Sequence, residues 1–256
     1  MCAGCSAAPT NEVRRYIMAP CTPKNTHTAL ELSHFRKRRH TTQVNLDEPD
    51  CFFKPSIRFP PYYYYYYYNA GMSQPMMLYF QNGNIYTGSV YYDSLTRSYL
   101  PHGNGTMTTP SGDTYTGSFS QGYKHGQGVS SSPTRQRTYR GGFVSDREEG
   151  YATIICPTEL GGQRTFVGYM QNNVRHGRGQ QTETTNTGRT VVFDGTWSND
   201  VLSGPGMFTL TEAGVTHFYQ GSFTNGKLEG YGTYSTSQDG TRYNAIYQGG
   251  NMICRY

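Results

Sequence analysis

Aromatic positions alternate with small or polar positions over the last two thirds of the chain. In the stretch 113–128, Tyr115, Gly117 and Phe119 stand two residues apart, with hydroxyl side chains between them. Side chains at this spacing lie on one face of a β-strand, so the stretch predicts a strand with an aromatic face. Glycine beside a ring leaves room for the ring to lie across the backbone. The glycine at 122 predicts a tight turn, because glycine tolerates a positive φ. The stretch therefore predicts one β-hairpin.

The same aromatic-x-Gly signature recurs at intervals of 24 to 29 residues. A fixed period of this length is typical of a repeat array. From the second copy to the sixth, a further glycine always follows nine residues after the signature glycine, so the hairpin has a constant length and the connections vary. The signature pairs are Tyr86/Gly88, Tyr115/Gly117, Tyr139/Gly141, Phe166/Gly168, Phe193/Gly195, Tyr219/Gly221 and Tyr247/Gly249.

Two further positions are constrained in the five central copies. The turn position holds only residues that tolerate a left-handed backbone: Gly122, Asp146, Asn173, Asp200 and Gly226. A second slot, two residues after the signature glycine, is always large and apolar. The two slots together predict a ladder of rings that forms a core or the floor of a groove. Its members are the candidates for partner binding along the repeat face: Tyr115, Phe119, Tyr139, Phe143, Phe166, Met170, Phe193, Trp197, Tyr219 and Phe223.

This pattern resembles the MORN repeat, whose core reads roughly Tyr-x-Gly-x-Trp-x-x-Gly-x-x-x-Gly-x-Gly. The resemblance covers about residues 84 to 250, and it is specific because landmarks and spacings agree in five successive copies. The first copy has an insertion from Tyr91 to Leu100, the third has Ala152 in place of its final glycine, and the seventh has Asn251 in the aromatic slot. We interpret the outer copies as caps. The resemblance implies an all-β fold, an elongated single array of antiparallel β-hairpins.

Two segments are predicted: an irregular extension at 1–79 and the repeat array at 80–256. Strands of roughly five to six residues are expected in the array. The last predicted strand, Ala245 to Met252, would lie at an open edge of the sheet, where a second copy could pair to form a homodimer.

The extension is basic near its start. Its first 40 residues hold seven lysines and arginines against two glutamates, which equals the net charge of +5 of the whole chain. The densest cluster is Arg36, Lys37, Arg38 and Arg39. Three interpretations stay open for it: a solvated tail, a binding site for an acidic protein surface, or contact with anionic lipid or nucleic acid. Nucleic acid is the least favoured of these partners.

A tract of consecutive tyrosines follows Pro60-Pro61 in the extension. Tyrosine offers a large contact area at a low rotamer cost, which suits an interface. We therefore hypothesise that the tract lies against a partner or along the array, and the alternative is a neutral repeat expansion in a linker. The tract consists of Tyr62, Tyr63, Tyr64, Tyr65, Tyr66, Tyr67 and Tyr68.

No arrangement typical of an enzyme is present in the sequence. His102, His125 and His176 each precede a landmark glycine, so the repeat explains their positions. Neither a nucleophile elbow, a zinc-protease motif nor a phosphate-binding loop occurs. Cys2 and Cys5 lack regularly spaced partners for zinc. We expect no enzymatic activity, no catalytic residues, no cofactor and no bound metal.

Repeat arrays present long surfaces and rarely perform chemistry. The sequence therefore predicts a non-enzymatic scaffold in the cytoplasm or cytoskeleton. By its resemblance to MORN proteins of the radial spoke head, it is expected in the axoneme of a cilium or flagellum, or in the cortical cytoskeleton, bound to other proteins of a large assembly. Two alternatives stay open: a peripheral membrane tether that binds anionic phospholipids, and a structural subunit of an organellar complex.

Overall fold

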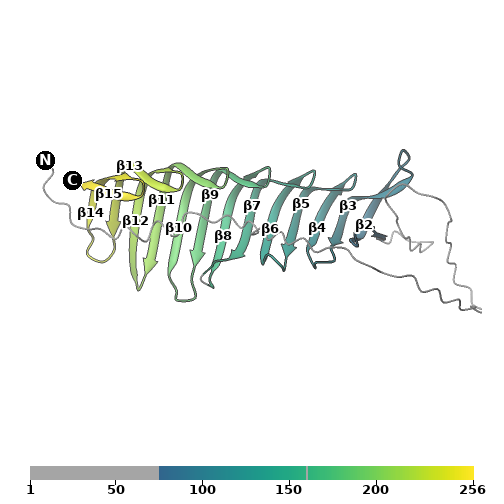
Figure 1. Cartoon of the computed structure of the whole chain (residues 1–256), viewed down its shortest axis with the longest axis horizontal. Coiled ribbons are helices and arrows are strands. Elements are labelled where there is room, and N and C mark those ends of the chain that lie inside the picture. The colour runs from purple at the N-terminus through teal and green to yellow at the C-terminus, as the bar shows by residue number, and fades with distance from the viewer. Residues whose placement is uncertain (1–74, 160) are drawn as a thin grey trace, which may run out of the picture.

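The computed structural model describes residues 75–159 and 161–256. These residues form one sheet of 15 strands and contain no helix, and each strand pairs with the next in antiparallel order. Figure 1 shows the strands side by side in chain order. The predicted all-β hairpin array is thus confirmed. The strands are β1 (Met76–Tyr79), β2 (Ile85–Asp93), β3 (Ser98–Thr108), β4 (Thr114–Ser120), β5 (Tyr123–Ser132), β6 (Arg137–Val144), β7 (Arg147–Pro157), β8 (Gln163–Gln171), β9 (Val174–Thr184), β10 (Thr190–Ser198), β11 (Val201–Glu212), β12 (Val215–Thr224), β13 (Lys227–Thr236), β14 (Arg242–Gln248) and β15 (Asn251–Arg255).

The turns between paired strands have the predicted left-handed backbone. Between β4 and β5, Gln121 has a φ of 50° and Gly122 a φ of 91°. Two successive positive φ values define the turn whose twist matches the twist of the flanking strands. The later hairpins repeat this geometry, for example at Asn199 and Asp200, with φ values of 49° and 68°. The turn chemistry predicted from the sequence is therefore confirmed.

Small residues pair with one another across 13 consecutive strands, from β2 to β14. We call this row the glycine spine. It explains the signature glycine of most repeats, because this glycine faces a second small residue on the neighbouring strand, as Gly117 faces Gly128. Its members, in strand order, are Gly88, Gly105, Gly117, Gly128, Gly141, Ala152, Gly168, Gly179, Gly195, Gly206, Gly221, Gly232 and Ala245.

The strands are longer than predicted because each ladder continues on both sides of the spine. β4 has seven residues and β11 has 12, against the roughly five to six expected. Many hairpins carry a register shift just beyond the spine, for example between Gly117 and Phe119. The sequence patterns on the two sides of such a bulge look like separate short strands, although the structure joins them.

The seventh repeat lies four residues earlier than the sequence analysis placed it. Ala245 pairs with Gly232 and so takes the place in the seventh repeat that we assigned to the signature glycine Gly249. The stretch predicted as one strand, Ala245 to Met252, is divided by a turn at Gly249 and Gly250 into β14 and β15. The prediction was wrong because alanine replaces the signature glycine, and alanine is small enough to fill the same place.

The first strand begins at Met76, inside the segment predicted as the extension, and pairs with β2. The insertion in the first copy lengthens its hairpin, since Tyr92 pairs with Tyr99 beyond the bulge. The sheet therefore begins slightly earlier than the boundary of 79/80 that we predicted.

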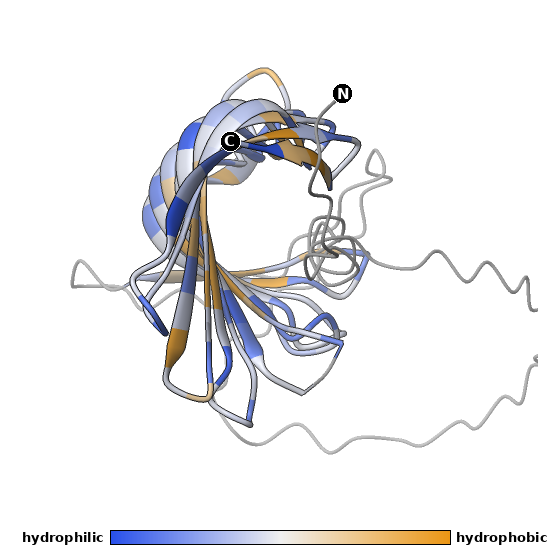
Figure 2. Cartoon of the chain, turned by 90° about the vertical axis from the view of Figure 1, so that its left-hand side faces the viewer, coloured by the Kyte–Doolittle hydropathy of each residue, from blue (hydrophilic) through white to orange (hydrophobic). Residues whose placement is uncertain are grey.

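Side chains alternate between two faces of the sheet, most clearly in the central strands. Along β10 the buried residues are Val191, Phe193, Gly195 and Trp197, and the residues between them are partly exposed. We call these the buried face and the exposed face. The view along the array shows the sheet curving strongly across its width (Figure 2). The curvature and the twist bring side chains of successive hairpins together on the buried face.

Candidate functional site

The structure places the predicted ring ladder in the core. All ten side chains lie on the buried face and are between 0 and 4% exposed. They are therefore packing residues in the described structure and offer almost no surface to a partner. The ten are Tyr115, Phe119, Tyr139, Phe143, Phe166, Met170, Phe193, Trp197, Tyr219 and Phe223. Neighbouring rings meet edge to face, and the centroids of Tyr115 and Phe143 are 4.9 Å apart.

Each signature tyrosine lies over the glycine spine and caps the bulge. A Cβ at Gly128 would lie 2.4 Å from Cε2 of Tyr115, so the ring occupies the space that a side chain at this position would need. The Tyr115 hydroxyl donates to the backbone oxygen of Ser118 at 2.8 Å, where the ladder is interrupted. Tyr86, Tyr139 and Tyr219 make the equivalent bond in their own repeats. Burial raises the pKa of Tyr115 to about 12, and the Asp146 carboxylate adds to this rise.

Adjacent hairpins are also joined at their turns by a contact that we call the turn clasp. The backbone N–H of Asp146 donates to the oxygen of Lys124 at 3.0 Å, and the N–H of Lys124 donates to Oδ1 of Asp146 at 2.8 Å. Asn173 and Glu148 repeat both bonds one hairpin further on. The turn residue thus supplies its left-handed backbone and, through its side chain, a second bond to the preceding hairpin.

The two residues of a clasp vary together. Where the turn residue is aspartate or asparagine, its partner is charged, and where it is glycine, its partner is apolar and only the turn N–H bonds. The six clasps are Pro101/Gly122, Lys124/Asp146, Glu148/Asn173, Arg175/Asp200, Leu202/Gly226 and Leu228/Gly250. The partner side chain lies on the buried face, where Leu202 and Leu228 fill the space that Arg175 fills with a guanidinium.

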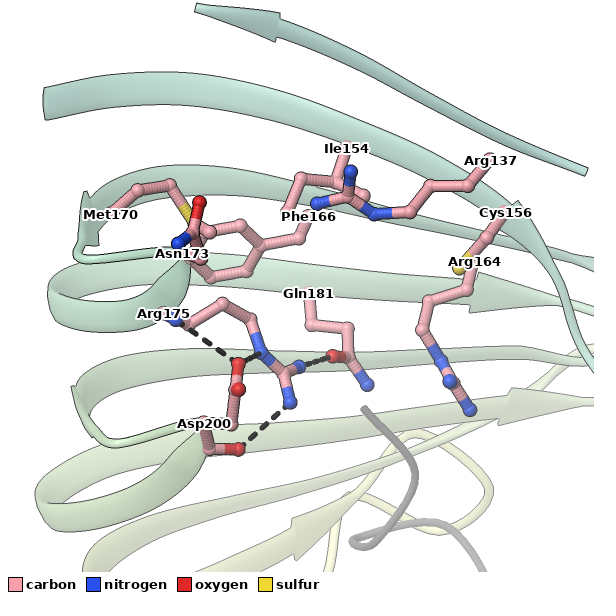
Figure 3. Close-up of a pocket in the computed structure, with 10 residues that line it drawn as sticks. All are labelled: Arg137, Ile154, Cys156, Arg164, Phe166, Met170, Asn173, Arg175, Gln181 and Asp200. Carbon is pink, nitrogen blue, oxygen red and sulfur yellow. Dashed lines mark hydrogen bonds and ion pairs between the residues drawn. The ribbon is translucent and has the colours of Figure 1, made fainter. Parts of the chain in front are cut away.

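A polar cluster surrounds Arg175 in the middle of the array (Figure 3). Arg175 stacks on Trp197, with 4.3 Å between its guanidinium carbon and the ring centroid, and bonds to Gln181. Gln181 donates to Glu183 at 2.8 Å, and Arg164 pairs with the same carboxylate at 2.7 Å. All four polar side chains are buried. Sequence reasoning missed this cluster, and the only signal for it was the joint variation of the clasp residues.

The pocket at this cluster encloses about 50 Å³ and is balanced in charge. Arg137 forms a bidentate pair with Glu148 at 2.6 Å, and Arg175 has Asp200 as its counter-ion at 2.9 Å. Burial lowers the pKa of the Arg175 guanidinium, and the bonds to Asp200 oppose that effect. With each arginine matched to a carboxylate, the pocket does not provide the excess positive charge that an anion would need. We interpret it as a structural network.

Among the residues that the structure describes, no group of three histidine, cysteine, aspartate or glutamate side chains is placed to hold a metal ion. No helix in those residues is long and apolar enough to span a membrane. The basic cluster Arg36 to Arg39 and the tyrosine tract Tyr62 to Tyr68 lie outside the described residues, so both hypotheses stay predictions.

Together the fold and the core define an elongated repeat protein built from clasped β-hairpins. Comparison with family models finds six copies of the MORN repeat in the chain, at residues 97–114, 115–137, 139–159, 166–182, 193–211 and 219–241. The chain belongs to the MORN-repeat proteins, as its sequence pattern predicted. The axonemal and radial-spoke assignment has no counterpart in these comparisons and stays a prediction.

Curated relatives match part of the chain. Alsin from rat and from human is 29% identical over 118 residues, which is 46% of this chain and 7% of Alsin. The ALS2 C-terminal-like protein of mouse is 33% identical over 79 residues, or 31% of this chain and 8% of that protein. The matched part of the chain therefore spans less than a tenth of these relatives.

Proposed function

We propose that this protein is a non-enzymatic scaffold that holds partner proteins along its β array. The observation that supports this most is the continuity of the sheet. Every hairpin from β2 to β15 is joined to its neighbour by backbone pairing, and turn clasps add a second connection. Such a body is stiff along its length and presents one exposed face over all strands, which suits several partners at fixed spacing.

The partners belong to a large assembly, and we propose the axoneme of a cilium or flagellum, with the cortical cytoskeleton as the related alternative. The resemblance to simple MORN proteins of the radial spoke head supports this location. The test is to tag the full chain and extract ciliated cells with detergent. Retention of the tagged chain with the axonemes is expected, and its complete release into the detergent fraction would contradict the location.

Membrane tethering is the competing role for MORN repeats, and the charge of the array weighs against it. Residues 75–256 hold 13 lysines and arginines and 12 aspartates and glutamates, so the array carries little net charge. Binding to anionic lipid depends on clustered positive charge near the membrane surface. Flotation of residues 75–256 with liposomes of phosphatidylserine is the test. Strong binding that salt abolishes would favour the tether over the scaffold.

A further inference from the structure

Two neighbouring tyrosines on the exposed face stand at a position where most repeats carry small or polar residues. We call their position the spine-flanking position. It is the residue next to the spine residue on each strand, in the direction of the clasped turns. Tyr151 and Tyr169 occupy it on β7 and β8, and their side chains are 59% and 52% exposed. The other repeats mostly carry small or polar residues there, for example Ser118, Gln127 and Ser222. The fold therefore does not require an aromatic ring at either place.

The two rings form one pair. Tyr151 and Tyr169 stand opposite each other in the β7–β8 register. Their ring centroids are 5.4 Å apart and their planes are inclined by 75°. Each ring therefore leaves a face open to solvent, and neither hydroxyl bonds to another of the described residues. The next pair on the same face, Thr153 and Val167, lies across the spine from the two tyrosines and is partly buried.

Arginines flank the pair on both sides. Arg178 on β9 adjoins Gly179, which pairs with Gly168 next to Tyr169. Its side chain is 69% exposed, and its ion pair with Asp194 is long, at 3.4 Å. On the other side, Arg140 on β6 is exposed and pairs with Thr153, two residues from Tyr151.

One carboxylate lies close to the pair along β7. Glu149, two residues before Tyr151, accepts the backbone N–H of Asn172 at 2.9 Å and is thereby held toward the neighbouring turn. Two exposed rings and two exposed arginines on the neighbouring strands β6 and β9 form a surface with a defined chemistry. We call Tyr151, Tyr169, Arg140 and Arg178 the tyrosine patch.

We propose that the tyrosine patch docks an extended, proline-containing segment of a partner protein that carries acidic side chains. Proline rings pack on aromatic faces, and a polyproline segment is already extended before it binds, so its ordering costs little entropy. Its backbone oxygens have no internal hydrogen bonds, and they can accept the free hydroxyls of Tyr151 and Tyr169. The exposed arginines select for carboxylates beside the prolines.

Single-stranded nucleic acid also stacks on aromatic rings, but the array lacks the positive groove that would follow its backbone. The 13 basic residues of 75–256 face 12 acidic ones, and Asp194 and Glu149 adjoin the patch. The charge balance therefore favours a peptide, with nucleic acid as an outcome that the test can reveal. The proposal rests on the scaffold function above and specifies one class of partner and its place.

The test variants use residues that other repeats of this protein carry at the spine-flanking position. Tyr151→Gln and Tyr169→Ser introduce the residues that other repeats carry at the same positions, Gln127 and Ser118. Tyr231→Gln is the control, because Tyr231 occupies the spine-flanking position of a later hairpin and is 72% exposed, yet lies outside the patch. Circular dichroism and thermal unfolding establish that each variant keeps its fold.

The probe is a fluorescein-labelled peptide of consecutive prolines between glutamates, titrated with the full chain and followed by fluorescence anisotropy. We expect saturable binding that weakens about tenfold or more in the Tyr151→Gln/Tyr169→Ser variant and is unchanged in Tyr231→Gln. A probe with alanine for proline, and one with lysine for glutamate, should bind at least about tenfold more weakly.

Absence of saturable binding, equal binding by the double variant, or equal binding of the alanine probe would each overturn the proposal. Tighter binding of a labelled oligothymidine than of the proline probe would assign the patch to nucleic acid and would overturn it as well. Retention with extracted axonemes is a separate readout, so failure of the peptide assay leaves the scaffold proposal to its own test.

Discussion

Asp200 and Arg175 hold two neighbouring hairpins together through four hydrogen bonds. The backbone N–H and Nε of Arg175 both donate to Oδ1 of Asp200, at 3.0 and 2.9 Å, and Nη2 donates to the Asp200 backbone oxygen at 2.8 Å. The N–H of Asp200 donates back to the Arg175 oxygen at 3.0 Å. One turn residue therefore closes its own hairpin and also bonds to the preceding one. The turns thus contribute to the contact between repeats.

Replacing Asp200 with glycine should weaken the array through the loss of this contact. Glycine keeps the positive φ, as at Gly226, so the variant removes the side-chain bonds without straining the turn. We expect Asp200→Gly to lower the free energy of unfolding by about 2 kcal/mol, below the full value for a buried pair because Asp200 is partly exposed. Urea unfolding followed by circular dichroism measures this. Asp194→Asn is the control, and its exposed pair with Arg178 should contribute less than about 1 kcal/mol.

The two clasp residues should be exchangeable only together. Arg175→Leu alone leaves the Asp200 carboxylate without its counter-ion, so we expect a loss of about 2 kcal/mol or more in unfolding free energy. Arg175→Leu with Asp200→Gly recreates the natural pair Leu202/Gly226 and should recover much of that loss. A double-mutant cycle in urea gives the coupling between the two positions. Additive effects would mean that the clasp residues act independently.

An added methyl group on the glycine spine should disturb the ring above it. The Cβ of Gly128→Ala would lie 2.4 Å from Tyr115, so we expect a loss of about 1–3 kcal/mol from overpacking. In a Tyr115→Leu background the ring is absent, and the same change should cost less than about 0.5 kcal/mol. Unfolding curves of the four proteins provide the comparison, and equal costs in both backgrounds would show that the ring is not the cause.

The buried tyrosine hydroxyls should make the protein sensitive to alkali. The pKa of Tyr115 is raised from 10.0 to about 12, so the folded state holds the phenolic proton more tightly than the unfolded chain. Its contribution to stability is complete below pH 10 and falls as the pH rises from 10 to about 12. Stability measured by thermal unfolding across this range should decline, and Tyr115→Phe should reduce the slope.

At pH 7 the same variant tests the bond to Ser118. Tyr115→Phe removes the donor and should cost about 1 kcal/mol, although Phe166 and Phe193 show that the repeat accommodates a phenyl ring. Tyr151→Phe serves as the control, since that hydroxyl bonds to no other described residue and its loss should change stability by less than about 0.5 kcal/mol. Equal losses in the two variants would indicate that the bond to Ser118 does not contribute to the free energy of unfolding.

Much of the candidate site was hidden from the sequence because it depends on contacts between repeats. The alternation around Tyr115 and Phe119 showed that these rings share a face, but the same pattern fits an exposed aromatic face and a buried one. Their burial depends on how the curved sheet brings successive hairpins together. Arg175 and Asp200 are 25 residues apart, and no local rule predicts that pairing.

The sequence by itself determined the all-β repeat, its period and its turns, because period-two alternation and left-handed turn residues act within a few neighbours. Only the tertiary structure decided which face is buried, that small residues such as Gly117 and Ala245 form one continuous spine, and that Asp200 reaches back to Arg175. These features arise from register and curvature across strands, which set distances between residues that are remote along the chain. For the same reason, the pairing of Tyr151 with Tyr169 emerged only when β7 and β8 were placed side by side.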